Sequence, residues 1–229
     1  MDVPVDEITL AALAARDGDQ AAAARFVRAT QADVWRLCAH LGDHGETQDL
    51  AQETYLRAFR SLGSFEGRAA AKTWLLAIAR RTCADAVRDR RRRPRVDPGA
   101  TVPETAQAGD LSDGVALRRQ VGALTPDRRD AFVLTQLVGL SYPEAADVCG
   151  VPIGTIRSRV ARAREDLVAG LSERAGRTGR TGRRYGLRRS GRRSLPTSAR
   201  PVRFSSSGGY LPVHPPATWS FRALTSHPA

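Results

Sequence analysis

Apolar side chains recur at helical spacing through most of this chain. Over residues 6–41 they fall three or four positions apart, with a polar break at 17–19. The same spacing returns at 48–62 and, after the loop GSFEGR, at about 70–92. Half-buried strands would instead alternate apolar and polar residues, and this region contains no such alternation. The pattern therefore predicts an all-α protein.

Prolines divide the helical pattern into two parts. Pro94 ends the first part, because the residue before a proline disfavours helical geometry. Residues 94–115 carry three prolines and few large apolar side chains, a composition typical of flexible linkers. We expect two small helical domains, at 6–93 and 116–171, joined by this linker.

Residues 141–168, SYPEAADVCGVPIGTIRSRVARAREDLV, have the pattern of a helix-turn-helix. Ala146 is small enough for two helices to approach closely, and Gly150 suits a left-handed turn. Pro152 suits the first turn of the next helix, where its missing N–H costs nothing. An apolar stripe then predicts the buried face of that helix: Ile156, Val160, Ala163 and Leu167.

The opposite face of this second helix is small and cationic, so it could enter a major groove. Its outward positions are Arg157, Ser158, Ala161 and Arg162. Arg159 and Arg164 flank that face and are better placed to contact phosphate. A purely structural helical pair with surface arginines is the alternative, but the turn, the stripe and the cationic face together favour DNA binding.

Two further groups of side chains are candidates for binding. Asp49, Gln52 and Glu53 share one face of the helix at 48–62, where they could dock a partner that carries arginine or lysine. Spacing alone, however, favours an ordinary solvated face.

The segment 64–93 combines aromatic and cationic side chains, which suits single-stranded or melted DNA. Phe65 lies in a loop between two glycines, so we expect its ring to be available for stacking on an unpaired base. Trp74 lies at the edge of an apolar stripe, which favours a place in the core. The candidates in this segment are Phe65, Arg68, Lys72, Trp74, Arg80 and Arg81.

The net charge of +12 is unevenly distributed. Residues 1–175 hold 25 basic and 24 acidic side chains, whereas residues 176–229 hold 11 arginines and no acidic residue. This tail has too few apolar residues for a core, so we expect disorder. Its arginines could add nonspecific nucleic-acid affinity. The complete lack of acidic residues favours an alternative, that the tail is unselected sequence such as an altered reading frame.

The remaining chemistry is sparse. The three cysteines are scattered, which argues against a disulfide framework and suits a reducing cytoplasm. We find no glycine-rich phosphate loop, no credible metal cluster and no nucleophile with a histidine partner, so we expect no cofactor and no enzyme activity. A thiol-based redox switch is an alternative whose only support is the presence of three isolated cysteines. We also expect no signal peptide and no membrane span.

Two blocks of sequence resemble the extracytoplasmic function (ECF) group of bacterial sigma factors. They are DLAQETYLRAFRSLGSFEGRAAAKTWLLAIARR at 49–81 and LTPDRRDAFVLTQLVGLSYPEAADVCGVPIGTIRSRVARARE at 124–165. The likeness covers roughly residues 8–171 and none of the tail. It implies a cytoplasmic promoter-specificity subunit whose sigma-2 and sigma-4 domains correspond to the two helical domains.

The resemblance also implies a role for each candidate surface. Docking on the polymerase β′ subunit is assigned to Asp49, Gln52 and Glu53. Capture and melting of the −10 promoter element are assigned to Phe65, Arg68, Lys72, Trp74, Arg80 and Arg81. Reading of the −35 element as duplex is assigned to Thr155, Arg157, Ser158, Arg159, Ala161 and Arg162.

The implied partners are RNA polymerase core, through its β and β′ subunits, promoter DNA and an anti-sigma factor. The linker has a net charge of −3 over 94–117, consistent with a segment that stands in for RNA near the exit path. Position 81 is arginine where some relatives carry asparagine, and position 161 is alanine where a bulkier residue can occur. The promoter preference of those relatives therefore cannot be assigned to this chain. The main alternative is a conventional helix-turn-helix regulator that binds palindromic DNA as a dimer without polymerase.

Overall fold

A computed structural model of the chain describes residues 6–43, 45–92 and 111–181. For 111–116 and 173–181 it describes the backbone only. The described residues form helices and turns without a strand, so the prediction of an all-α protein is confirmed. The tail beyond residue 181 and most of the predicted linker lie outside the described residues.

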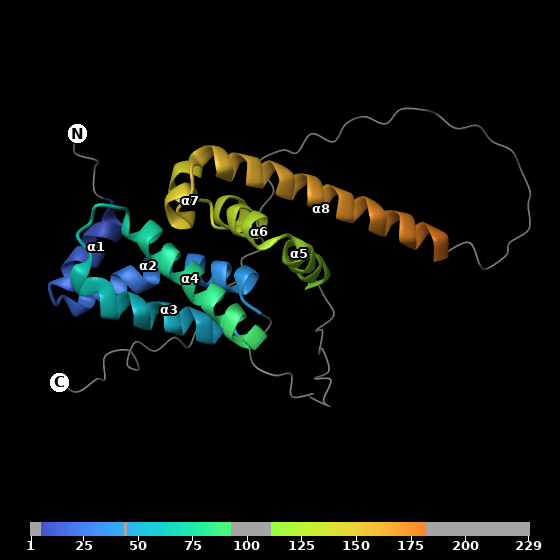
Figure 1. The fold of residues 1–229 in the computed structure, drawn as a ribbon. Helices are drawn as coiled ribbons and strands as arrows, with labels where there is room; N and C mark the ends of the chain where they lie inside the picture. Colours follow the sequence, from blue (N-terminus) through green and yellow to red (C-terminus); the bar gives the residue numbers. More distant parts are fainter. Residues whose placement is uncertain (1–5, 44, 93–110, 182–229) are drawn as a thin grey trace, which may run out of the picture.

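The first unit is a bundle of four helices (Figure 1). They are α1 (Glu7–Arg16), α2 (Gln20–Leu41), α3 (Thr47–Ser61) and α4 (Ala71–Arg92), with a short 3-10 turn, η1 (Leu62–Ser64), between the last two. Asp6 and Asp19 cap α1 and α2 by accepting from the backbone N–H groups of Thr9 and Ala22. Tyr55, Phe26 and Leu75 fill the interior, where the Tyr55 hydroxyl lies 2.8 Å from the Thr30 hydroxyl.

The second unit is built from shorter helices. They are α5 (Leu111–Ala123), α6 (Pro126–Phe132), a π-helical turn η2 (Val133–Leu137), α7 (Tyr142–Cys149) and α8 (Ile153–Thr181). Figure 1 shows the C-terminal part of α8 extending away from the rest of the protein. Within the described residues, no helix is both long enough and apolar enough to cross a membrane.

The two units pack directly against each other. Helix α4 contacts α7, and α2 contacts η2 and α5, so the buried apolar residues of both units form one cluster. An ion pair between Arg80 of α4 and Asp130 of α6 crosses this boundary. Spacing along the chain contains no information about this contact between the units.

Two helix ends differ from the predicted boundaries. Helix α5 begins at Leu111, inside the stretch 94–115 predicted as linker. Helix α8 continues through Thr181, past the predicted start of the tail at residue 176. No proline falls between Pro103 and Pro126 or between 153 and 181, so the backbone can stay helical where composition alone suggests a linker or a tail.

Candidate nucleic-acid interface

The helix-turn-helix of α7 and α8 has the predicted local geometry. Ser141 and Glu144 form a reciprocal capping box at the start of α7. Gly150 adopts a left-handed conformation with φ of 65°, which ends α7 and turns the chain into α8. Ile156, Val160 and Ala163 are buried, and Leu167 is half-buried, so the predicted stripe does face the core.

The opposite face of α8 is open to solvent. Arg157, Ser158, Ala161 and Arg162 are all exposed. The Ser158 hydroxyl donates to the carbonyl of Thr155, which is itself half-buried. Among the residues that the structure describes, neither Arg157 nor Arg162 takes part in an ion pair. Both guanidinium groups therefore keep their full set of donors for a ligand.

Other arginines of the second unit hold its helices together. Arg159 of α8 donates to Asp127 of α6 at 2.6 Å, and its side chain is only 22% exposed. Arg128 of α6 reaches back to Asp166 of α8 at 2.6 Å. Arg159 was predicted to contact phosphate, but here it serves the α6–α8 contact.

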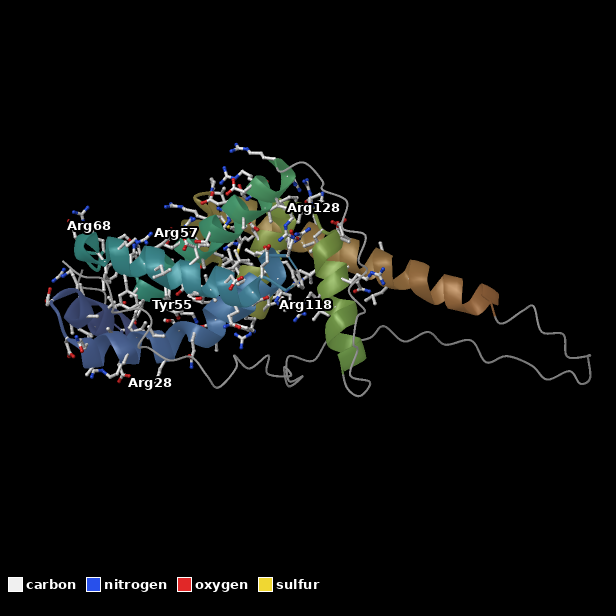
Figure 2. All side chains as sticks on the ribbon, turned by 90° about the horizontal axis from the view of Figure 1, so that it is seen from below. Arg28, Tyr55, Arg57, Arg68, Arg118 and Arg128 are labelled. Atoms are coloured by element: carbon white, nitrogen blue, oxygen red, sulfur yellow. The ribbon has the colours of Figure 1, made fainter. Side chains whose placement is uncertain are left out.

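The predicted docking face lies on α3, where Asp49 and Gln52 are exposed. Glu53 is half-buried and accepts from Arg57 at 2.8 Å. Arg57, which is labelled in Figure 2, also donates to Asp85 of α4 at 2.8 Å, and this pair joins the two helices. The face is therefore acidic at Asp49 and charge-balanced at Glu53. The three predicted residues do share one helix, as their spacing indicated.

The predicted exposure of Phe65 is wrong. Its side chain is only 5% exposed and packs on Trp74 of α4, with ring centroids 4.8 Å apart. A short loop can still bury a large ring when both neighbouring helices line the same core. Phe65 is thus an anchor of the loop and cannot stack on a base in this structure. Trp74 is half-buried against the core, as the edge of the stripe predicted.

The predicted cations of the first unit are split between two environments. Arg68 and Arg81 are exposed, although Arg68 pairs with Glu66 of the same loop, and Figure 2 shows Arg68 at the end of the bundle away from the second unit. Lys72 instead pairs with Asp33 of α2 at 2.7 Å, and Arg80 pairs with Asp130. The structure therefore does not bring all of these cations to one open surface. Their partners lie far away in sequence, so spacing contains no signal for them.

The Arg80–Asp130 pair lies in a partly dehydrated boundary between the units. Burial raises the pKa of the Asp130 carboxyl, and the nearby Arg80 charge offsets this effect only in part. Burial by itself lowers the pKa of Arg80, but the charge and the hydrogen bond of Asp130, together with the nearby Cys149 and Asp127, raise it, and the net direction is upward. Both side chains are mostly covered, at 26% and 16% exposed. Removing either partner would leave the other with an uncompensated charge.

Two of the three cysteines, Cys83 and Cys149, are placed where their thiols stay protonated. Cys38 and Cys83 are buried side chains of α2 and α4, and hydrogen bonding to Cys38 together with burial raises the pKa of Cys83. Burial raises the pKa of Cys149 to about 11. Thiols in such surroundings react slowly, because the thiolate is the reactive form. In the described part of the chain, no cluster of histidine, cysteine and carboxylate side chains has the arrangement of a metal site.

Comparisons with known proteins match both units. The family model described as Sigma-70 region 2 matches residues 26–93, and Sigma-70, region 4 matches residues 114–167. The ECF RNA polymerase sigma factor SigC of Mycobacterium tuberculosis is 50% identical over 169 residues, which is 72% of this chain and 91% of that protein. The ECF RNA polymerase sigma-E factor of Escherichia coli K12 is 34% identical over 165 residues, which is 66% of this chain and 86% of that protein.

Solved structures agree with the sequence matches. CnrH, in complex with the cytosolic domain of CnrY, aligns with a TM-score of 0.61 at 25% identity, over 73% of this chain and 99% of that one. The sigma factor RpoE in complex with the anti-sigma factor NepR from Bartonella quintana aligns with a TM-score of 0.53 at 32% identity, over 65% of this chain and 94% of that one. With both sigma-70 regions matched in order and relatives this similar over most of their length, the chain belongs to the sigma-70 family of RNA polymerase sigma factors, in its ECF group.

Proposed function

We propose that three surfaces divide the task of this sigma factor, which is to direct RNA polymerase to promoters. The observation that carries the proposal is the outer face of α8. There Arg157 and Arg162 stay exposed and outside ion pairs of the described residues, while the stripe beneath them is buried. This face lies within the region 4 match.

The face of α8 reads the −35 element as duplex. Arg157 and Arg162 donate to base edges in the major groove, and Ser158 contacts a neighbouring base or sugar. Ala161 leaves room for close approach between them. Thr155 and Arg159 lie at the border of this surface and position α8 against the sugar-phosphate backbone of the DNA.

The face of α3 docks on the polymerase core. Asp49 and Gln52 supply exposed acceptors. Glu53 adds a third acceptor when a cation of the polymerase shares its carboxylate with Arg57. Acceptors at this spacing suit a basic helical surface, and the resemblance supports a partner surface on β′.

The loop before α4 and the first half of that helix capture the −10 strand. Arg68 and Arg81 are the exposed cations of this surface, and Lys72 and Trp74 border it. Phe65 is excluded from direct contact by its burial. Arg80 joins the surface only when its ion pair with Asp130 is broken.

The protein acts in the cytoplasm with the β and β′ subunits and promoter DNA, and it needs no cofactor or chemistry of its own. Melting is driven by capture of unpaired bases. An anti-sigma factor is a further partner in this proposal. Its support is that CnrH and RpoE, which this chain resembles, were each solved in a complex, RpoE with an anti-sigma factor.

The test is binding of the full chain to polymerase core that lacks sigma, with Gln52→Ala/Glu53→Ala alongside. Glu7→Ala/Gln20→Ala removes the same side-chain types from exposed positions on α1 and α2 and is the matched control. We expect tight binding by the wild type and the control and clearly weaker binding by the first variant. Thermal unfolding of all three proteins checks that each is folded.

Two outcomes would contradict the proposal. Equal affinity of both double variants for polymerase core would show that the core does not dock on this face of α3. Absence of core binding, combined with dimeric binding to palindromic DNA, would make the protein an ordinary helix-turn-helix regulator.

A further inference from the structure

Helix α1 makes a hydrogen bond at each end of the segment 65–71, which is the loop before α4 and the first residue of that helix. Arg16 Nη1 donates to the carbonyl of Phe65 at 3.1 Å, across 49 positions of sequence. The Thr9 hydroxyl accepts from the backbone N–H of Ala71, the first residue of α4, at 2.8 Å. Between these points, Gly67 lies so close to Leu13 that a Cβ there would come within 3.3 Å of a Leu13 methyl group. Helix α1 lies outside the residues that the region 2 model matches.

The guanidinium of Arg16 is itself held in place. Asp17 accepts from Nε at 2.8 Å and from Nη2 at 3.3 Å, which leaves Nη1 for the Phe65 carbonyl. The fork geometry of arginine allows all three contacts at once, whereas a lysine ammonium could not reproduce it. Only 32% of the Arg16 side chain is exposed.

These contacts fix the loop from its inner side. The Phe65 ring is buried against Trp74, and its carbonyl is tied to Arg16. Ser64, Glu66 and Arg68 therefore face solvent from a backbone that is already ordered. A loop held in one conformation loses less entropy on binding, and it presents its contacts in one fixed arrangement.

We infer that Arg16 is a positioning residue for capture of the −10 strand, and that it acts by holding the Phe65 carbonyl. The inference rests on the proposed function of this loop. In this role Arg16 contacts Asp17 and the Phe65 carbonyl, and it touches no base. Its contribution is to the discrimination between sequences, since a loop without this tether can adjust to many strands.

The experiment uses full-length chain assembled with polymerase core and a single-stranded DNA pool randomised across the −10 region. The wild-type holoenzyme selects its preferred sequence, and the affinity for that sequence is then compared with the affinity for a scrambled one. The variants are Arg16→Ala, Arg16→Lys and Asp17→Ala. Arg25→Ala is the matched control, because Arg25 is an exposed arginine of α2 whose partner is Asp19.

We expect Arg16→Ala to lower the ratio of the two affinities about tenfold, the effect of one charge-assisted hydrogen bond. Arg16→Lys and Asp17→Ala should fall between this variant and the wild type, and Arg25→Ala should match the wild type. Core affinity should not change. The slope of log affinity against log salt should also stay the same, because a positioning residue releases no counterion from the strand.

Three results would overturn the inference. An unchanged affinity ratio in Arg16→Ala would show that the tether does not affect discrimination. Equal losses on both strands with a shallower salt slope would make Arg16 a direct phosphate contact. Lost core affinity would make it a general structural residue. If the wild-type holoenzyme itself selects no sequence, the proposed function of the loop fails instead, and the two failures are thus distinguishable.

Discussion

Arg80 Nε lies 2.5 Å from Oδ2 of Asp130, and this ion pair joins the four-helix unit to the helix-turn-helix unit. Arg80 is a candidate for the −10 strand by resemblance, yet its charge here is used inside the protein. Its neighbour Arg81 is exposed. Consecutive arginines on one helix thus differ in role because they point to different sides of α4.

Replacing Arg80 by alanine should leave a mostly buried carboxylate without its partner. Because burial raises the pKa of Asp130 and Arg80 opposes that rise, the pKa should increase further in Arg80→Ala. A raised carboxyl pKa adds stability that is fully present below its ordinary value of 3.8 and is lost as pH rises through the folded value. Arg80→Ala should therefore cost about 1–2 kcal/mol at neutral pH and less near about pH 4.

Denaturant unfolding at both pH values measures this difference, and the carboxyl chemical shift of Asp130 reports its pKa. Arg81→Ala, at an exposed position of the same helix, is the control and should behave as wild type at both pH values. A loss of stability in Arg80→Ala that is independent of pH would contradict the account.

The threonine that joins α1 to α4 provides a second test. Thr9→Val keeps the shape of the side chain but leaves the buried N–H of Ala71 without its acceptor. The free energy of unfolding should fall by about 1–2 kcal/mol. Thr125→Val is the matched control, because Thr125 precedes α6 without making a capping hydrogen bond and should cost little. Similar losses of unfolding free energy in the two variants would show that the hydrogen bond from Ala71 to Thr9 does not contribute to stability.

Two glycines of the helix-turn-helix should respond to alanine in opposite directions. Gly150 has φ of +65° with open space around it, so alanine there meets only backbone strain and should destabilise by about 1 kcal/mol. Gly154 lies in the helical part of α8, also with open space, and alanine there should stabilise by about 0.4–1 kcal/mol. Thermal unfolding of both variants measures the two changes in stability. Changes of the same sign would refute the conformations assigned to these glycines.

The exposed arginines of α8 should separate base reading from phosphate contact. Arg162→Ala should weaken binding of the holoenzyme to its −35 duplex by about 1–3 kcal/mol if Arg162 donates twice to one base. Competition with random duplex measures the specific part of this loss. Arg164→Ala is the comparison, because Arg164 donates to Gln136 at 2.7 Å and should change specificity little. Equal losses on specific and random duplexes would reduce Arg162 to a phosphate contact.

The helices themselves were predictable from the chain because their causes are local. Apolar spacing gave α2, α3, α4 and α8 their buried faces, and Gly150 and Ser141 mark ends that the structure reproduces. The outer face of α8 follows from the same periodicity. Two long blocks of matching residues were also enough to indicate the family, which the comparisons show.

The availability of each candidate side chain was decided only by tertiary structure. Phe65 is buried by Trp74, Arg80 is held by Asp130 and Lys72 by Asp33. Arg16 gained a role that no spacing suggested, through a carbonyl 49 positions away. Periodicity states which face of a helix is apolar, because that depends on residues three or four apart. It cannot state which distant charge or ring will meet that helix, because such contacts depend on how the helices pack.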